Sequence, residues 1–233
     1  MSETSLARIH ASVDAYYSAK VESFGATPRG VDWTCEATQK LRFVQLLRHC
    51  DTTSRASIND LGCGYGALLA FCRERAPAWQ LDYLGIDLSG AMVRAAQATW
   101  HDEAGVRFVQ GTRSPRVADY SIASGIFNVC GAIERDGWEG FIRTTLRAMK
   151  ASTRRAVAVN FMAPPASGPS APSQLYRTPA APWIEFCEDE LGARTTLIGD
   201  YGLREFTLWL ACAGDEARPV EKAAERSRPR LRH

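Results

Sequence analysis

The sequence lacks an excess of charge of either sign and has few histidines. Its 28 basic and 26 acidic side chains leave a net charge of +2 over 233 residues. A chain so evenly balanced creates no large field to attract a polyanion, so nucleic acid is not an expected partner. The four histidines, at positions 10, 49, 101 and 233, are dispersed. This spacing argues against a histidine-based metal or nucleophilic site, and we expect each histidine to be a surface or packing residue.

Cysteine pairs and long hydrophobic runs are also absent. The seven cysteines are odd in number and scattered, without a C-x-x-C pair of the zinc or redox kind, so we expect reduced thiols in a cytoplasmic protein. No run approaches the roughly 20 apolar residues that a membrane span requires, and the first residues lack the apolar core of a signal peptide. We therefore expect a soluble protein without a membrane partner.

The first 52 residues carry two helical patterns. Apolar and aromatic residues recur at three- and four-residue steps over residues 5–25, which predicts an amphipathic helix. Residues 26–32, with a proline and a glycine, interrupt this pattern, and a second helix is expected over residues 34–50. We predict that residues 1–52 form a helical lid on the substrate side of the protein.

Strand and helix patterns alternate in the segment that we expect to form the core, residues 53–213. The predicted strands are 57–61, 81–86, 106–109, 120–123 and 156–161, and the predicted helices between them are 67–75, 89–100 and 138–149. This alternation indicates a doubly wound α/β fold, because parallel neighbours need crossover helices that cover both faces of the sheet.

The last part of the core begins with a proline-rich stretch, residues 163–182, which we expect to be a long surface loop over a site. A helix over 183–191 and strands over 194–198 and 204–212 follow it. The short link at Tyr201 and Gly202 makes the two strands an antiparallel pair. The charged residues 214–233 are expected to form a disordered tail.

A glycine-rich turn follows the first predicted strand. Asp60 precedes Gly62, Gly64 and Gly66, whose lack of side chains permits a sharp turn and a close approach of ligand to backbone. With Asp87 at the end of the next strand, the turn fits a dinucleotide fingerprint. It also fits a site for S-adenosylmethionine, which has an ammonium group and a sulfonium but no pyrophosphate, so that a carboxylate at Asp60 attracts it. The two preceding helices favour this second interpretation.

Three motifs carry a family resemblance. Residues 58–66, 83–89 and 118–125 resemble the first, second and fourth-strand motifs of class I S-adenosylmethionine-dependent methyltransferases. Residues 16–17, 25–33, 125–128 and 201–207 are similar to a bacterial subgroup that acts on small molecules. The resemblance covers residues 57–212 and implies a Rossmann-like, seven-stranded sheet, mostly parallel with a reversed last strand.

The same resemblance implies the cofactor contacts. Asp87 would hold both ribose hydroxyls, the turn from Gly62 to Gly66 would pass under the methionine part, and Gly111 and Thr112 would lie near adenine. The sequence departs from the family where Gln110, Gly111 and Thr112 replace a frequent acidic residue. The full set of expected cofactor-binding residues is Asp60, Gly62, Gly64, Gly66, Asp87, Leu88, Met92, Gly111, Thr112, Ser124 and Gly125.

Candidates for the acceptor site come from the N-terminal helices, the end of the fourth strand and the proline-rich loop, since these meet at the carboxyl ends of the strands. We expect Tyr17 and Asn128 to position the substrate for catalysis and four further residues to bind it: Tyr16, Trp33, Phe127 and Tyr176. Helix packing is the alternative for Tyr16 and Tyr17, and a hydrophobic staple is the alternative for Trp33. Asp60 and Asp87 have the alternative roles of a helix-entry anchor and a helix cap.

The leading hypothesis is in-line transfer of a methyl group from S-adenosylmethionine, with S-adenosylhomocysteine as product, to oxygen or nitrogen of a small-molecule metabolite, in secondary metabolism for example. Three alternatives remain open: a methyltransferase of nucleic acid or protein, a nicotinamide oxidoreductase, and a non-catalytic S-adenosylmethionine-binding module. No flipped-base motif and no aromatic-basic patch favours the first of these. Monomer and homodimer are both compatible with the sequence.

Overall fold

The computed structural model describes residues 2–31, 35–165 and 174–212. These residues form seven strands and six α-helices, with one short 3-10 helix, η1. In chain order the elements are α1 (Glu3–Phe24), η1 (Pro28–Val31), α2 (Glu36–Leu46), β1 (Ala56–Leu61), α3 (Ala67–Arg75), β2 (Leu81–Asp87), α4 (Gly90–Thr99), β3 (Val106–Gln110), β4 (Ala118–Ala123), α5 (Arg135–Ala151), β5 (Thr153–Met162), α6 (Ala181–Asp189), β6 (Arg194–Ile198) and β7 (Glu205–Ala211).

The seven strands form one sheet in the order β3-β2-β1-β4-β5-β7-β6. Neighbours pair in parallel from β3 to β5, and β7 inserts antiparallel between β5 and β6. The reversal follows from the short link between β6 and β7, which leaves no room for a crossover helix. The predicted doubly wound fold with a reversed last strand is confirmed. Strand order changes direction between β1 and β4, where folds of this kind open a crevice for ligands.

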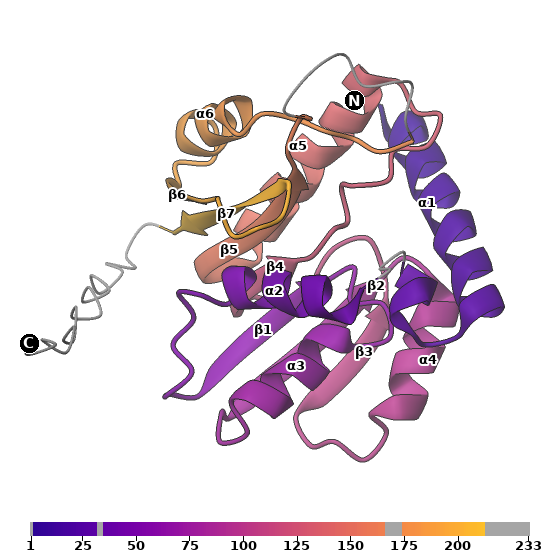
Figure 1. Cartoon of the computed structure of the whole chain (residues 1–233), viewed down its shortest axis with the longest axis vertical. Coiled ribbons are helices and arrows are strands. Elements are labelled where there is room, and N and C mark those ends of the chain that lie inside the picture. Colours follow the sequence, from indigo (N-terminus) through magenta and orange to yellow (C-terminus); the bar gives the residue numbers. More distant parts are fainter. Residues whose placement is uncertain (1, 32–34, 166–173, 213–233) are drawn as a thin grey trace, which may run out of the picture.

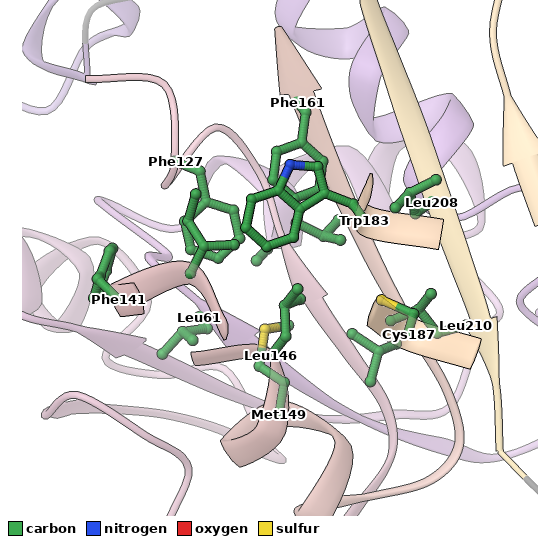
Figure 2. Packing of buried hydrophobic residues seen from close by; sticks show 14 of the residues in the cluster. Leu61, Phe127, Phe141, Leu146, Met149, Phe161, Trp183, Cys187, Leu208 and Leu210 are labelled. Atoms are coloured by element: carbon green, nitrogen blue, oxygen red, sulfur yellow. The ribbon is translucent and has the colours of Figure 1, made fainter. Parts of the chain in front are cut away.

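Helices cover both faces of the sheet (Figure 1). On one face, Phe43, Leu46 and Leu69 from α2 and α3 share a core with Val93 of α4. On the other face, α5 and α6 cover the sheet with a core of large rings. Figure 2 shows Phe127, Phe161 and Trp183 in this second core, where Phe161 stacks on both of the other rings with centroid distances of 5.4 Å. Their stacking fixes where the chain can run after β4.

The long helix α1 packs against α4 and α5 beside the sheet (Figure 1). Ser2 caps its first turn by accepting from the Ser5 amide, and Gly25, with φ of 66°, ends it. Ser18 on α1 is hydrogen-bonded to Ser89, the N-cap of α4, with an Oγ–Oγ distance of 2.8 Å. The helix is thereby held over the carboxyl ends of the strands, where a ligand site is expected.

Several predicted boundaries differ from the structure. The second helix is shorter than 34–50, since α2 spans Glu36–Leu46. The expected loop over 163–182 ends earlier, because α6 begins at Ala181 and accepts Pro182 in its first turn, where the missing N–H has no helical partner to lose. The expected tail, residues 214–233, lies outside the described residues. Within the described part, no helix has the length and apolarity to cross a membrane.

Candidate functional site

A cavity of about 230 Å³ lies at the carboxyl ends of β1, β2 and β4. Helices α1, α2 and α5 contribute to its wall through residues such as Tyr17, Gln39 and Phe141. The cavity therefore sits at the point where the strand order changes direction, between the sheet and the N-terminal helices. Most of the wall is apolar, and the polar groups that do face it are few, so the chemistry of the site rests on those groups.

The glycine turn forms one side of the cavity. Gly62 and Gly64 line it, with φ of 74° and 52°, which side-chain-bearing residues rarely adopt. A Cβ atom on Gly62 would lie 2.2 Å from Cγ2 of Ile126. Gly66 has a different role: it adopts φ of 90° as the N-cap of α3, and a Cβ there would meet the Trp100 ring at 2.6 Å. Gly66 shapes the turn from behind, away from the cavity.

Asp87, the last residue of β2, ties the turn to the next helix. One carboxylate oxygen accepts from the Gly64 amide at 2.8 Å and the other from the Ser89 amide at 2.9 Å. Burial raises the pKa of this carboxyl to about 6, and the two amide hydrogen bonds oppose that rise. Ser89, whose Oγ accepts from the Met92 amide at 3.2 Å, is the residue that caps α4. Asp87 thus stabilises the glycine turn through the Gly64 amide, and it also lines the cavity.

Asp60 places a second buried carboxyl in the same wall, with 2% of its surface exposed. Burial raises its pKa to about 7, the hydrogen bond from the Tyr83 hydroxyl opposes the rise, and the like charge of Asp87 adds to it. Two carboxyls that lose water and repel each other are stabilised in their charged form by a cation between or beside them. This half of the cavity is accordingly suited to a ligand with positive charge.

The remaining residues expected to bind a cofactor also reach the cavity. They are Leu88, Met92, Gly111, Thr112, Ser124 and Gly125. The Gly111 amide donates to the backbone oxygen of Asp87 at 2.9 Å, which fixes the start of the loop after β3. The Ser124 hydroxyl is buried and finds no hydrogen-bond partner within the described ranges. An unsatisfied buried hydroxyl on a cavity wall is a group that a ligand can satisfy.

Gly125 is held by a chain of buried polar groups that reaches back to helix α2. Its amide donates to Oδ1 of Asn160 at 2.7 Å, and Nδ2 of Asn160 donates to Glu205 at 3.1 Å. Glu205 in turn accepts from Nε and Nη2 of Arg42 on α2. Sequence reasoning missed this relay, because its members come from α2, β5 and β7. The signal in the sequence was the presence of two charged residues, Arg42 and Glu205, in segments whose apolar patterns are those of buried elements.

Of the five expected acceptor-site residues that the structure describes, two line the cavity: Tyr17 from α1 and Asn128 from the loop after β4. Asn128 is 5% exposed, and its Oδ1 finds no hydrogen-bond partner within the described part of the chain. Tyr16 is not on the cavity wall; its ring meets Tyr17 edge to face at 5.1 Å and lies under the Lys20 ammonium. Trp33 lies outside the described residues.

Phe127 and Tyr176 belong to the core instead of the cavity wall. Phe127 is 1% exposed and stacked on Phe161, whereas Asn128, the next residue in a turn closed by the hydrogen bond from its amide to the Gly125 carbonyl, lines the cavity. Tyr176 is 4% exposed and donates its hydroxyl to Glu139 at 2.9 Å. Its neighbour Leu175, bridged to Val129, reaches the cavity in its place.

His10 is a cavity residue that was expected to be a surface or packing residue. Its ring meets Phe141 of α5 edge to face, with a centroid distance of 5.7 Å, and lines the cavity. Burial lowers the pKa of this imidazole below its usual 6.5, which favours the neutral form of the ring. The signal was present in the sequence, because His10, Val13 and Tyr17 follow the three- and four-residue steps of one helix face and all three line the cavity.

Comparison with known proteins decides the family. Residues 58–152 match the family model described as a methyltransferase domain. Rv1506c of Mycobacterium tuberculosis (strain ATCC 25618 / H37Rv), a proposed methyltransferase, is 39% identical over 152 residues, which cover 65% of this chain and 90% of that protein. This chain belongs to the methyltransferase family.

Solved structures share the fold of this methyltransferase. Magnesium protoporphyrin IX methyltransferase from Synechocystis PCC 6803, in a structure with bound S-adenosylhomocysteine, superimposes with a TM-score of 0.60 at 13% identity, covering 86% of this chain and 98% of that one. The pyocyanin biosynthetic protein PhzM gives a TM-score of 0.62 at 18% identity, covering 84% and 62%. With its reversed seventh strand, the chain is a class I S-adenosylmethionine-dependent methyltransferase.

The residues that line the cavity fit S-adenosylmethionine, the cofactor of this methyltransferase. The Gly62–Gly64 backbone offers a surface without side chains, and the Ser124 hydroxyl is a buried group without a partner in the described part. Asp60 and Asp87 offer negative charge to a molecule that carries an ammonium and a sulfonium. Among the described residues no group of three or more His, Cys, Asp or Glu side chains has the arrangement of a metal site.

Proposed function

We propose that this methyltransferase transfers a methyl group to oxygen or nitrogen of a small molecule inside the cavity. The observation that carries the proposal is that a single cavity is lined by residues expected to bind the donor and by residues that we propose to contact the acceptor. Gly64 and Asp87 line one part of its wall, and His10, Asn128 and Leu175 line another. A donor in the first part and an acceptor in the second would meet without leaving the protein.

In the part of the wall that includes Gly64 and Asp87, each residue would contact a different part of the donor. Asp87 would accept hydrogen bonds from the ribose hydroxyls, and Asp60 would attract the ammonium end across the turn. Gly62 and Gly64 would let the methionine part lie against the backbone. Gly111 and Thr112 would lie next to the adenine, and Leu88 and Met92, which also line the cavity, would supply apolar surface beside it. When bound, S-adenosylmethionine supplies a methyl group on a positively charged sulfur.

Alignment and exclusion of water account for most of the expected rate. Displacement at a methyl group requires the acceptor atom, the carbon and the sulfur to lie in line, and fixed geometry of this kind lowers a barrier by about 7–11 kcal/mol in favourable cases. A positioned base adds about 10²–10⁴-fold. Tyr17 and Asn128 are the residues that we propose to orient the acceptor, since both line the cavity beyond the glycine turn.

Two further facts support a small acceptor. Neighbours of the fold include enzymes whose names specify small molecules, among them magnesium protoporphyrin IX methyltransferase and human N-acetylserotonin methyltransferase. The described lining residues include no lysine or arginine, and neutralising phosphates with such side chains is the main source of nucleic-acid affinity. A nicotinamide cofactor fits poorly as well, because the carboxylate of Asp60 beside the turn would repel its pyrophosphate.

The proposal is tested by methyl transfer from radiolabelled S-adenosylmethionine. The purified protein is incubated with a bacterial metabolite extract of low molecular mass, with total RNA and with total protein, and the label is followed in each fraction. We expect label in the small-molecule fraction alone. Label confined to RNA or protein would contradict the proposal, and tight binding without transfer to any fraction would identify a non-catalytic binding module.

A further inference from the structure

The acceptor end of the cavity contains a polar group that nothing in the described structure satisfies. Asn128 is only 5% exposed, and its Oδ1 has no hydrogen-bond partner among the described residues. Its backbone is fully engaged, since the amide donates to Gly125 and the carbonyl accepts from Tyr176. Leaving such a group without a partner costs about 1–3 kcal/mol. A side chain held rigidly in that state on a cavity wall is a ready partner for a ligand's hydrogen-bonding group.

The surroundings of Asn128 are apolar and carry no positive charge. The wall beyond the glycine turn includes six hydrophobic side chains: Val13, Ile126, Val129, Phe141, Met162 and Leu175. The charged residues among the described lining residues are Asp60 and Asp87, both on the donor side. An anionic acceptor would lose its hydration here without gaining a cation, at high cost. The wall therefore selects an uncharged and mainly apolar molecule.

His10 supplies the second polar group of this chamber. It stands on α1 one turn before Val13 and two turns before Tyr17, and its ring is fixed edge-on against Phe141. A neutral imidazole in an apolar wall accepts a proton readily when the partner becomes strongly acidic during a reaction. A hydroxyl oxygen that gains a methyl group becomes such a partner, whereas a neutral amine needs no base to begin the attack.

We infer that the methyl acceptor is an uncharged, mainly apolar hydroxyl compound, that the amide of Asn128 binds its hydroxyl region, and that His10 takes the hydroxyl proton. The inference rests on the proposed function and narrows it. The bond that forms joins the acceptor oxygen to the methyl carbon, and the bond that breaks joins that carbon to sulfur. Sulfur keeps the electron pair, and the proton moves from the oxygen to His10 and then to water.

Other titratable side chains share the cavity with His10. In the described part of the wall they are Tyr17 on α1, Asp60 on β1, Cys63 and Tyr65 in the turn, and Asp87 on β2. From α5, Phe141 and Thr145 face the cavity and carry no charge. Because Asp60 and Asp87 act on the donor, experiments on His10 are made at saturating S-adenosylmethionine, where their effect on donor binding no longer limits the rate.

Binding of matched ligands tests the acceptor class. The protein saturated with S-adenosylhomocysteine is titrated with naphthols and phenylphenols and, in parallel, with their carboxylated and phosphorylated analogues. We expect binding in the uncharged series, and at least tenfold weaker binding in the anionic series. Preference for the anionic compounds, or no binding in the uncharged series, would overturn the inference. Neither result would affect the proposed function, which is judged by the fraction that receives label.

Two variants and one control test the residues. His10→Gln should lower turnover of the bound hydroxyl compound by 100-fold or more, and its rate should recover as rising pH ionises the hydroxyl directly. Asn128→Ala should raise the KM for that compound at least tenfold. Both should keep the wild-type affinity for S-adenosylmethionine. His49→Gln is the matched control, because His49 is also half-buried, with its pKa lowered by burial and its ring edge-on to Trp209, but does not line the cavity.

These measurements separate the proton-accepting role from a structural one. The role of His10 is supported if His10→Gln loses turnover but keeps its donor affinity and thermal stability, and if His49→Gln keeps its turnover. Wild-type turnover in His10→Gln, or an equal loss of turnover and donor affinity, would overturn it. If His10→Gln does not fold, Asn128→Ala still decides the acceptor contact, because an unchanged KM in that variant contradicts it.

Discussion

Asp60 and Asp87 are single residues whose charge sets the chemistry of the donor site. Burial raises the pKa of Asp60 to about 7 and that of Asp87 to about 6, well above the values of exposed aspartates. Both can be identified from sequence by their place at strand ends beside a glycine turn. Their raised pKa values cannot, because burial depends on which parts of the folded chain pack around them.

Donor affinity should therefore depend on pH. A bound sulfonium and ammonium favour the ionised carboxyls, so S-adenosylmethionine binding should release protons and should tighten as pH rises from about 5 to about 8. For the unliganded protein the sign is opposite: carboxyls with raised pKa values stabilise the folded state below about pH 4, and this contribution is lost as pH rises through 6 and 7. Calorimetry in buffers of different ionisation enthalpy measures the released protons. Affinity that is constant over this range would contradict the assignment.

Gly62 is the residue at which a methyl group should do most harm. In Gly62→Ala the new Cβ would collide with Ile126 and the backbone would be held at φ of 74°. We expect a loss of about 1–3 kcal/mol of stability and a marked loss of donor affinity. Gly131→Ala is the control, since Gly131 also has a positive φ, of 60°, but open space around it. Urea unfolding and donor titration of both variants check this. Equal effects would show that backbone strain alone is responsible.

At the scale of elements, local patterns predicted much and tertiary contacts decided the rest. The helix over residues 67–75 and the strand over 194–198 match α3 and β6, because glycine, proline and turn residues mark their ends. The helix expected from residue 138 begins at Arg135, since no strong capping residue marks its start. Phe127 was expected in the site because it follows β4, but stacking on Phe161 turns it into the core.

The relay from Arg42 to Gly125 should make helix α2 and the sheet one cooperative unit. Glu205→Gln would leave the buried Arg42 guanidinium without a charged partner, and we expect a loss of about 3–5 kcal/mol. Replacing both Arg42 and Glu205 by apolar residues of similar size should recover much of that loss. Glu190→Gln, at an exposed pair with Arg147, should cost at most about 1 kcal/mol. Urea unfolding of the four proteins checks this; similar losses in the buried and exposed pairs would contradict it.

The whole molecule combines a predictable scaffold with a cavity that is not predictable in detail. Alternation of strands and helices was sufficient for the doubly wound fold, and the short link at Tyr201 and Gly202 for the antiparallel pair. The expected donor residues came from the family resemblance and stay a prediction. The acceptor end depends on which side chains α1, the loop after β4 and the segment around Leu175 direct inward. Helix periodicity places His10 on the same face of α1 as Tyr17 and separates it from Tyr16, but no pattern in the sequence tells that Leu175 lines the cavity while Tyr176 does not.

The central claim is that the turn after β1 and the carboxylate ending β2 hold S-adenosylmethionine. Isothermal titration of the wild-type protein should show micromolar binding, on the order of −7 to −8 kcal/mol, and no binding of NADH. Asp87→Ala should weaken the affinity by about 10- to 100-fold, since a charged acceptor is worth about 1.5–3 kcal/mol, whereas Glu74→Ala on the exposed side of α3 should leave it unchanged. Wild-type affinity in Asp87→Ala, or heat released by NADH alone, would contradict the account.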